Sequence, residues 1–304
     1  MEIILHIGAH RTGSTALERC LSDNADALRA EGTAIWGPSR MRSLLNFDKA
    51  MSLRAAMRAK DPDATAAWKT LRATVARELA AEADAGITKL LISEENMLGT
   101  MRSNLLEGRL YANARRNLAA YAALLPERPV RIGIGIRDYA AYWLSAYAYV
   151  ISRTQAALIP DLAELAPALA ACRRSWTKVL ASVSEVFPQA ERFVWRVEEL
   201  RGRPLQVACQ LIGREKGIEG LLPLEKTVNA SRLRPADIPA FRALRLAHPD
   251  WSLRQLRRAL PADAEPQDWF TENEMEAMQL RFALDLLQLA DDTGGIRLIG
   301  EAAA

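Results

Sequence analysis

Short apolar runs alternate along the chain with longer stretches of helical periodicity. Four runs have the length of buried strands and are bounded by turn or polar residues: 3–7, 89–93, 130–136 and 192–197. Between them, apolar residues recur at the spacing of one helix face, which predicts helices over 14–32, 68–84, 139–153 and 275–289. Strands that alternate with helices are joined by parallel crossovers. The pattern therefore predicts an α/β fold in which helices flank a central, mostly parallel sheet.

The 304 residues show no internal repeat, low-complexity linker or sharp change of composition. A chain of this length is sufficient for one large α/β domain or two small ones. We expect a single domain over residues 1–304, with helical or loop elaborations around 36–85 and 223–270. Residues 160–167 are expected to form an insertion or lid. The Pro- and Arg-rich span 223–266 is either a lid or a set of surface helices with loops, and the second interpretation is favoured.

Composition and charge narrow the class of protein. The net charge of +3 is too small an excess to indicate nucleic-acid binding, so no nucleic-acid partner is expected. Three scattered cysteines without a C-x-x-C pair, and three dispersed histidines, argue against a disulfide framework and against a metal site. No apolar run approaches the ~20 residues of a membrane span, and the N-terminus lacks a cationic signal region. We therefore expect a cytoplasmic protein without integral membrane association.

Residues 8–15, GAHRTGST, have the spacing of a Walker A phosphate loop, but Ser14 stands where the lysine belongs and the nearby cation is Arg11. An apolar strand precedes the stretch and an amphipathic helix follows it. A loop that opens a helix presents unpaired N–H groups and a positive dipole end to an anion. Gly13 lets the backbone approach that anion, and Ser14 and Thr15 add hydroxyl donors. The stretch is either such an anion site or an incidental Gly/Ser/Thr turn.

The missing lysine bears on which anion is bound. In nucleoside-triphosphate enzymes the lysine reaches the β- and γ-phosphates and the Ser/Thr ligates magnesium. The run LLIS followed by Glu94 and Glu95 could pass for a Walker B element, which usually ends in aspartate. Both motifs thus depart from the pattern of a kinase or NTPase.

The stretch LHIGAHRTGSTALERCL resembles the 5′-phosphosulfate loop of sulfotransferases that use 3′-phosphoadenosine 5′-phosphosulfate (PAPS). That family's loop reads [KR]-[ST]-G-[ST]-[ST], usually with lysine first. The resemblance implies that the leading cation, here Arg11, contacts the bridging and sulfuryl oxygens. It also implies a loop that binds the co-substrate through His10, Arg11, Thr12, Gly13, Ser14 and Thr15.

A second stretch, RDYAAYWLSAY, is similar to the family's 3′-phosphate motif R-D-P-x-x-R-x-x-S-x-Y. Arg137 and Ser145 stand at the matching separation, whereas Tyr139 replaces the proline and Tyr142 the second arginine. An arginine at a strand's end and a serine two turns into the next helix can hold one phosphate together. The plain alternative is an exposed strand end and helix start.

A candidate general base follows the second apolar run, in LLISEENMLG. A strand-end carboxylate near the loop can take a proton from an attacking hydroxyl. The segment is similar to an S-x-E found in carbohydrate-type sulfotransferases, with Glu95 as the first candidate and Glu94 as the second. Side chains alternate along an extended segment, so one of the two faces the cleft. The alternatives are His10 as the base, or a helix cap with two solvated acids.

A third segment, EKTVNASRLRP, resembles a basic N-x-S loop that folds over the nucleotide in related bacterial sulfotransferases. Asn229 and Ser231, with Arg232 and Arg234, are the residues concerned. A plain basic loop is the alternative.

Together the resemblances cover the chain to about residue 153 and then the Asn/Ser segment. They imply a three-layer P-loop-type fold and metal-independent transfer of a sulfuryl group from PAPS to a hydroxyl of a carbohydrate, lipid or small molecule. Two alternatives stay open at this point. One is a P-loop kinase or NTPase that uses ATP and magnesium. The other is a non-catalytic nucleotide-binding protein, as arginine in place of lysine at position 11 suggests.

Overall fold

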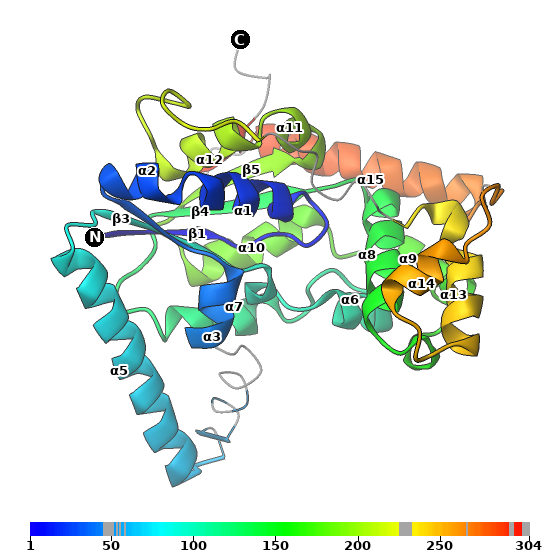
Figure 1. Ribbon diagram of the computed structural model, residues 1–304, viewed down its shortest axis with the longest axis horizontal. Coiled ribbons are helices and arrows are strands. Elements are labelled where there is room, and N and C mark those ends of the chain that lie inside the picture. The colour runs from blue at the N-terminus through cyan, green and yellow to red at the C-terminus, as the bar shows by residue number, and fades with distance from the viewer. Residues whose placement is uncertain are drawn as a thin grey trace.

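The structure is a computed structural model that describes residues 1–44, 52, 54, 56–57, 59–224, 233–265, 267–291 and 295–299. Within these residues, six strands form one parallel sheet in the order β2-β3-β1-β4-β5-β6 (Figure 1). The strands are β1 (Glu2–His6), β2 (Thr33–Trp36), β3 (Lys89–Ser93), β4 (Arg131–Ile136), β5 (Glu191–Arg196) and β6 (Ile296–Ile299). The predicted α/β class with a parallel sheet between helices is confirmed.

Helices cover both faces of the sheet, which gives the three layers (Figure 1). Alternate residues of β1 belong to different cores, because Ile3 and Leu5 pack in one hydrophobic cluster and Ile4 in the other. The Ile4 cluster lies under four helices: α1 (Ser14–Asp23), α2 (Ala25–Ala30), α11 (Val197–Gly202) and α12 (Pro204–Ile212). The larger cluster includes side chains of α3 (Pro38–Leu44), α5 (Pro62–Asp84), α6 (Met101–Glu107), α7 (Ala114–Ala122), α8 (Tyr139–Arg153), α10 (Trp176–Val186) and α15 (Glu272–Ala290).

The predicted helices agree with the structure except after the loop. There the expected helix is divided at Asn24, whose side-chain amide donates to the carbonyls of Cys20 and Leu222 at 2.8 and 3.0 Å. Its carbonyl oxygen accepts from Leu222 N at 2.6 Å. Asn24 is therefore an anchor for a distant segment, and the helix restarts beyond it as α2.

Residues 160–167 are a packed helix rather than the expected lid. Here α9 (Leu162–Ala170) begins at the N-cap Asp161 and buries Leu162 and Leu169 completely. The apolar spacing of a helix face prevails over the two prolines that suggested an insertion. In the described part of 223–266, α13 (Ile238–Ala247) and α14 (Leu253–Arg258) are surface helices, as favoured above. Within the described residues there are also three short 3₁₀ turns: η1 (Glu95–Met97), η2 (Ala156–Leu158) and η3 (Pro235–Asp237).

The strand order positions the candidate residues. Strand β1 lies between β3 and β4, so the chain segments that leave these three strands emerge side by side at one edge. They are the loop at 7–13, the Glu94–Glu95 pair and Arg137. Ligands of open parallel sheets bind in the crevice at the carboxyl ends of the strands, where the direction of winding reverses. Among the described helices, none is long and apolar enough to cross a bilayer.

Candidate functional site

Glycines allow the loop after β1 to lie directly against β4. The N–H of Ala9 donates to Gly135 O at 3.1 Å. A Cβ at Gly135 would be 2.5 Å from Thr12 Oγ1, so a larger residue there would displace the loop. Gly13 has φ 96° and caps α1, and a Cβ on it would be 2.2 Å from Leu200 Cδ2. The loop conformation thus depends on glycines both inside it and in the neighbouring strand.

Two loop hydroxyls are used within the loop itself. Thr12 Oγ1 and Ser14 Oγ both donate to Ala9 O, at 2.6 and 3.2 Å. Thr12 is fully buried, so its side chain shapes the loop. Ser14 and the exposed Thr15 line a pocket, and they stand at the start of α1, where the first N–H groups have no acceptor within the helix.

Arg11 connects the loop to the second predicted motif. Its Nε donates to Ser145 Oγ at 2.9 Å, and Arg137 Nη1 donates to Arg11 O at 3.1 Å. The backbone of Arg11 is left-handed, with φ 64°, a conformation that costs a non-glycine residue about 1–2 kcal/mol. The three residues therefore meet at one point, although Arg137 and Ser145 are joined through Arg11 and neither lines the pocket.

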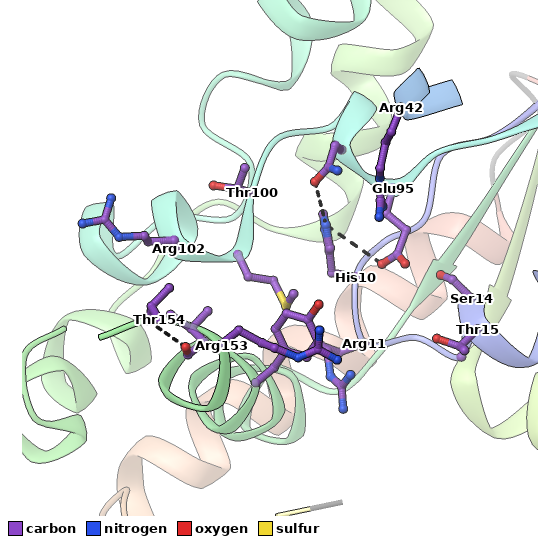
Figure 2. Close-up of a pocket in the computed structure, with 15 residues that line it drawn as sticks. His10, Arg11, Ser14, Thr15, Arg42, Glu95, Thr100, Arg102, Arg153 and Thr154 are labelled. Carbon is purple, nitrogen blue, oxygen red and sulfur yellow. Dashed lines mark hydrogen bonds and ion pairs between the residues drawn. The ribbon is translucent and has the colours of Figure 1, made fainter. Parts of the chain in front are cut away.

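The pocket has a volume of about 460 Å³ and lies at the carboxyl edge of the sheet (Figure 2). The loop and Glu95 form one side. Thr100 and Arg102, from the start of α6, and Arg153, from the end of α8, lie on the other. Its size falls within the range of small-molecule sites. Among the described residues, no group of three or more His, Cys, Asp or Glu side chains is placed to hold a metal ion.

The two candidate carboxylates have different environments. Glu94 is buried and accepts from Arg42 at both oxygens, at 3.1 and 3.2 Å, and also from Asn96 N at 3.0 Å. It therefore caps η1 and neutralises Arg42. Glu95 lines the pocket, with 18% of its side chain exposed. As the alternation of side chains requires, one of the pair faces the cleft.

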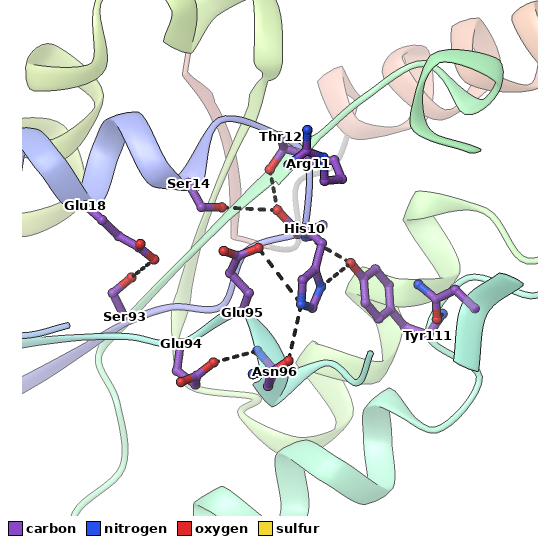
Figure 3. Close-up of polar contacts among 12 residues, drawn as sticks. His10, Arg11, Thr12, Ser14, Glu18, Ser93, Glu94, Glu95, Asn96 and Tyr111 are labelled. Atoms are coloured by element: carbon purple, nitrogen blue, oxygen red, sulfur yellow. Dashed lines mark hydrogen bonds and ion pairs between the residues drawn. The ribbon is translucent and has the colours of Figure 1, made fainter. Parts of the chain in front are cut away.

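Burial raises the pKa of Glu95 to about 7, and the neighbouring Glu94 charge adds to this effect; Arg11 and Arg42 oppose it. A second carboxylate behind the pocket, Glu18 of α1, accepts from Ser93 Oγ at 3.2 Å (Figure 3). Burial and the charge of Glu95 raise the pKa of Glu18 to about 8. The carboxyl group that lines the pocket, Glu95, thus has a pKa near neutrality, which suits a general base.

His10 is held by a chain of buried hydrogen bonds (Figure 3). Asn104 Nδ2 donates to Tyr142 OH at 2.7 Å, and Tyr142 OH donates to Tyr111 OH at 3.3 Å. Tyr111 OH also accepts from His10 N, so its own hydrogen goes to His10 Nδ1 at 3.0 Å. The proton of His10 is therefore on Nε2, which lies 3.3 Å from Asn96 Oδ1 and 4.0 Å from Glu95 Oε2. Burial lowers the pKa of His10 to about 4, so the ring is neutral.

Most of the Asn/Ser segment lies outside the residues that the structure describes, so its prediction is not tested. Asn229, Ser231 and Arg232 lie outside the described residues. Arg234 forms an ion pair with Asp237 at 2.7 Å and does not line the pocket.

Sequence reasoning did not identify several residues of the site. Arg153 lies one helical turn after Tyr149 on α8, a spacing that places the two side chains on one face and could have indicated a pair. Arg42 and Tyr111 reach the site from distant elements by tertiary packing, without a local pattern that points to them.

Comparisons with protein families, with curated proteins and with solved structures give no match to this chain.

Proposed function

We propose that the chain is a sulfotransferase that transfers a sulfuryl group from PAPS to an acceptor hydroxyl. The observation that carries the proposal is the junction at Arg11. The loop cation contacts Ser145 and Arg137, which are more than 120 residues away in sequence, and it shares a pocket with Glu95. These are the four residues to which the sulfotransferase resemblance gives distinct roles.

The loop suits a phosphosulfate because its positive groups converge on one point. The first N–H groups of α1 and the positive end of the helix face the pocket beside Ser14 and Thr15. Ser145 Oγ accepts from Arg11, so its own hydrogen is left to donate to a phosphate oxygen. Arg137 lies next to Arg11 but outside the pocket lining, and we assign it to the 3′-phosphate as a separate cation.

Arginine in place of lysine at position 11 is compatible with catalysis. Its role is to stabilise the charge that develops on the bridging oxygen as the bond to sulfur breaks, which needs a fixed positive charge rather than a proton. The contacts to Ser145 and Tyr149 hold the guanidinium in place. The left-handed backbone of Arg11 is strained, and such strain concentrates at functional positions.

Glu95 is the base in this proposal. As the acceptor oxygen forms its bond to sulfur, the hydroxyl proton passes to the Glu95 carboxylate. The electron pair of the breaking S–O bond stays on the phosphate of 3′,5′-ADP. Glu94 is already paired with Arg42. The Nε2 atom of His10 carries a proton, so on the pocket side this ring donates a hydrogen bond and does not accept the proton of the hydroxyl. A pKa near 7 leaves a substantial fraction of Glu95 ionised at neutral pH.

A thermal-shift comparison of 3′,5′-ADP, ADP and ATP with magnesium tests the proposal. The first two are isomers of equal composition that differ in the position of one phosphate, so ADP is a matched control. At ~100 times the dissociation constant, 3′,5′-ADP should stabilise the protein by about 2.7 kcal/mol. ADP at the same concentration should give a much smaller shift. Equal shifts, or a preference for ATP with magnesium, would contradict the sulfotransferase assignment, and the latter would favour a kinase or NTPase.

A further inference from the structure

The ring of Tyr149 is contacted by arginines from two different elements. The guanidinium carbon of Arg11, from the loop, lies 5.1 Å from the ring centroid, and that of Arg153, from the last turn of α8, lies 5.2 Å from it. All three residues line the pocket. One aromatic side chain therefore contacts two cations.

The arginines of the pocket differ in whether a carboxylate neutralises them. Arg42 is neutralised by the two hydrogen bonds to Glu94. Within the described residues, no carboxylate pairs with Arg153, although its neighbour around the ring is a second guanidinium. Two like charges in contact with one ring repel each other, and an anion bound next to them offsets that repulsion. The pocket is therefore prepared for an anionic group at this position.

We infer that Arg153 is a second binding residue for the sulfuryl group of the donor, in addition to Arg11, and that Tyr149 positions both arginines. The inference rests on the proposed function. The sulfuryl oxygens stay negatively charged while the bond to the bridging oxygen breaks and the bond to the acceptor oxygen forms. Arg11 uses its Nε for Ser145, so Arg153 supplies further N–H donors to those oxygens. In this arrangement two guanidinium groups contact the sulfuryl oxygens in place of the lysine that usually stands first in the family's loop.

The test compares two ligands that differ by the sulfuryl group alone. PAPS carries it, whereas 3′,5′-ADP has the same nucleoside and both phosphates without it. Dissociation constants of both are measured by calorimetry, without acceptor, for the wild type and for Arg153→Ala. The matched control is Arg72→Ala, which removes an exposed arginine of α5 that does not line the pocket.

We expect Arg153→Ala to weaken PAPS binding by about 10- to 100-fold, the usual effect of losing charge-assisted hydrogen bonds. Binding of 3′,5′-ADP should stay within about twofold by the same reasoning, and Arg72→Ala should change neither. Tyr149→Phe keeps the ring and should bind PAPS like the wild type. Tyr149→Leu removes the ring and should weaken PAPS selectively.

Two results would overturn the inference: equal weakening of both ligands by Arg153→Ala, or no weakening of PAPS. Arg153→Gln, which keeps most of the side-chain length, repeats the comparison if the alanine variant is unstable. A wild-type protein that binds neither 3′,5′-ADP nor PAPS would contradict the proposed function itself. That failure is distinct, because it appears before any variant is made.

Discussion

Two carboxylates near the same sheet, the buried Glu82 and the partly buried Glu95, have opposite surroundings. Glu82, on α5, accepts from Trp36 Nε1 at 2.9 Å and forms ion pairs with Arg29 and Arg40 at 2.8 and 3.1 Å. Burial alone would raise the pKa of Glu82, but the hydrogen bonds from Trp36 and Arg29 outweigh it and lower the pKa. Glu95 has His10 at 4.0 Å and no comparable partner among the described residues, and its pKa rises to about 7.

The difference separates a structural carboxylate from a functional one. Glu82 ties together β2, α2, α3 and α5, and its charge is fully used by these contacts. Glu95 is held close to a like charge, Glu94, in a partly dehydrated pocket, which costs stability and yields a group that titrates near neutral pH. A carboxylate whose surroundings raise its pKa toward neutrality, as those of Glu95 do, is typical of a functional site.

The largest expected effect is on catalysis. Glu95→Gln should lower turnover of PAPS by about 10²- to 10⁴-fold, because the amide cannot accept the acceptor proton. Its affinity for 3′,5′-ADP should not change, since the product lacks the sulfuryl group near Glu95. In the wild type, turnover should rise with pH through an apparent pKa of about 7, as the carboxylate form of Glu95 becomes populated. The measurements are turnover with radiolabelled PAPS and calorimetry with 3′,5′-ADP. Unchanged turnover would remove Glu95 from the mechanism.

The complementary variant is Glu82→Gln, which should lower stability and leave turnover unchanged. It should lower the free energy of unfolding by about 2 kcal/mol, because Arg29 and Arg40 lose their charged partner and Trp36 loses a charge-assisted bond. Turnover per folded molecule should stay at the wild-type level. Denaturant unfolding and activity at 25 °C measure the two quantities. If Glu82→Gln lost activity without losing stability, the distinction between the two carboxylates would be wrong.

The sequence predicted the fold well where burial repeats with a period. The helix at 139–153 agrees with α8 at both ends, because Asp138 caps it and its apolar face is continuous. Strands β2 and β6 were missed because each has four residues and lies at an edge of the sheet, where the apolar run is too short to stand out.

The candidate site was predicted in part, for a physical reason. Arg11, Glu95 and Arg137 follow directly from neighbouring strands, so the topology brings them together once the sheet is parallel. Tyr111 and Arg42 approach from a turn and from α3, and their roles depend on packing between elements that no local spacing encodes. For the same reason the sequence could not decide whether His10 is the general base. The hydrogen bond that Tyr111 OH donates to His10 Nδ1 fixes the proton of His10 on Nε2.

The smallest expected effect concerns Glu18, and it is a change in how the free energy of unfolding depends on pH. The pKa of Glu18 is about 8 in the folded protein, above the ordinary value of 4.5. Below pH 4.5 the carboxyl group is protonated in both the folded and the unfolded protein, so its burial does not lower the free energy of unfolding. As pH rises through 8 the group becomes charged in the folded protein, and the free energy of unfolding has then fallen by the full penalty. Glu18→Gln removes the penalty. The variant should therefore unfold at the wild-type temperature at pH 4.5 and a few degrees higher at pH 8.5, equivalent to about 1–2 kcal/mol after allowance for partial solvation.

Glu82→Gln is the matched control for this titration, with the opposite sign. The pKa of Glu82 is lowered, so its stabilisation is present above the unfolded-state pKa and lost as pH falls. The loss caused by Glu82→Gln should therefore be larger at pH 8.5 than at acidic pH. Because the charge of Glu95 raises the pKa of Glu18, the gain from Glu18→Gln should shrink in a Glu95→Gln background. Differential scanning calorimetry of the four variants at both pH values measures this coupling. An additive result would show that Glu18 and Glu95 titrate independently, and Glu18 would then have no influence on the base.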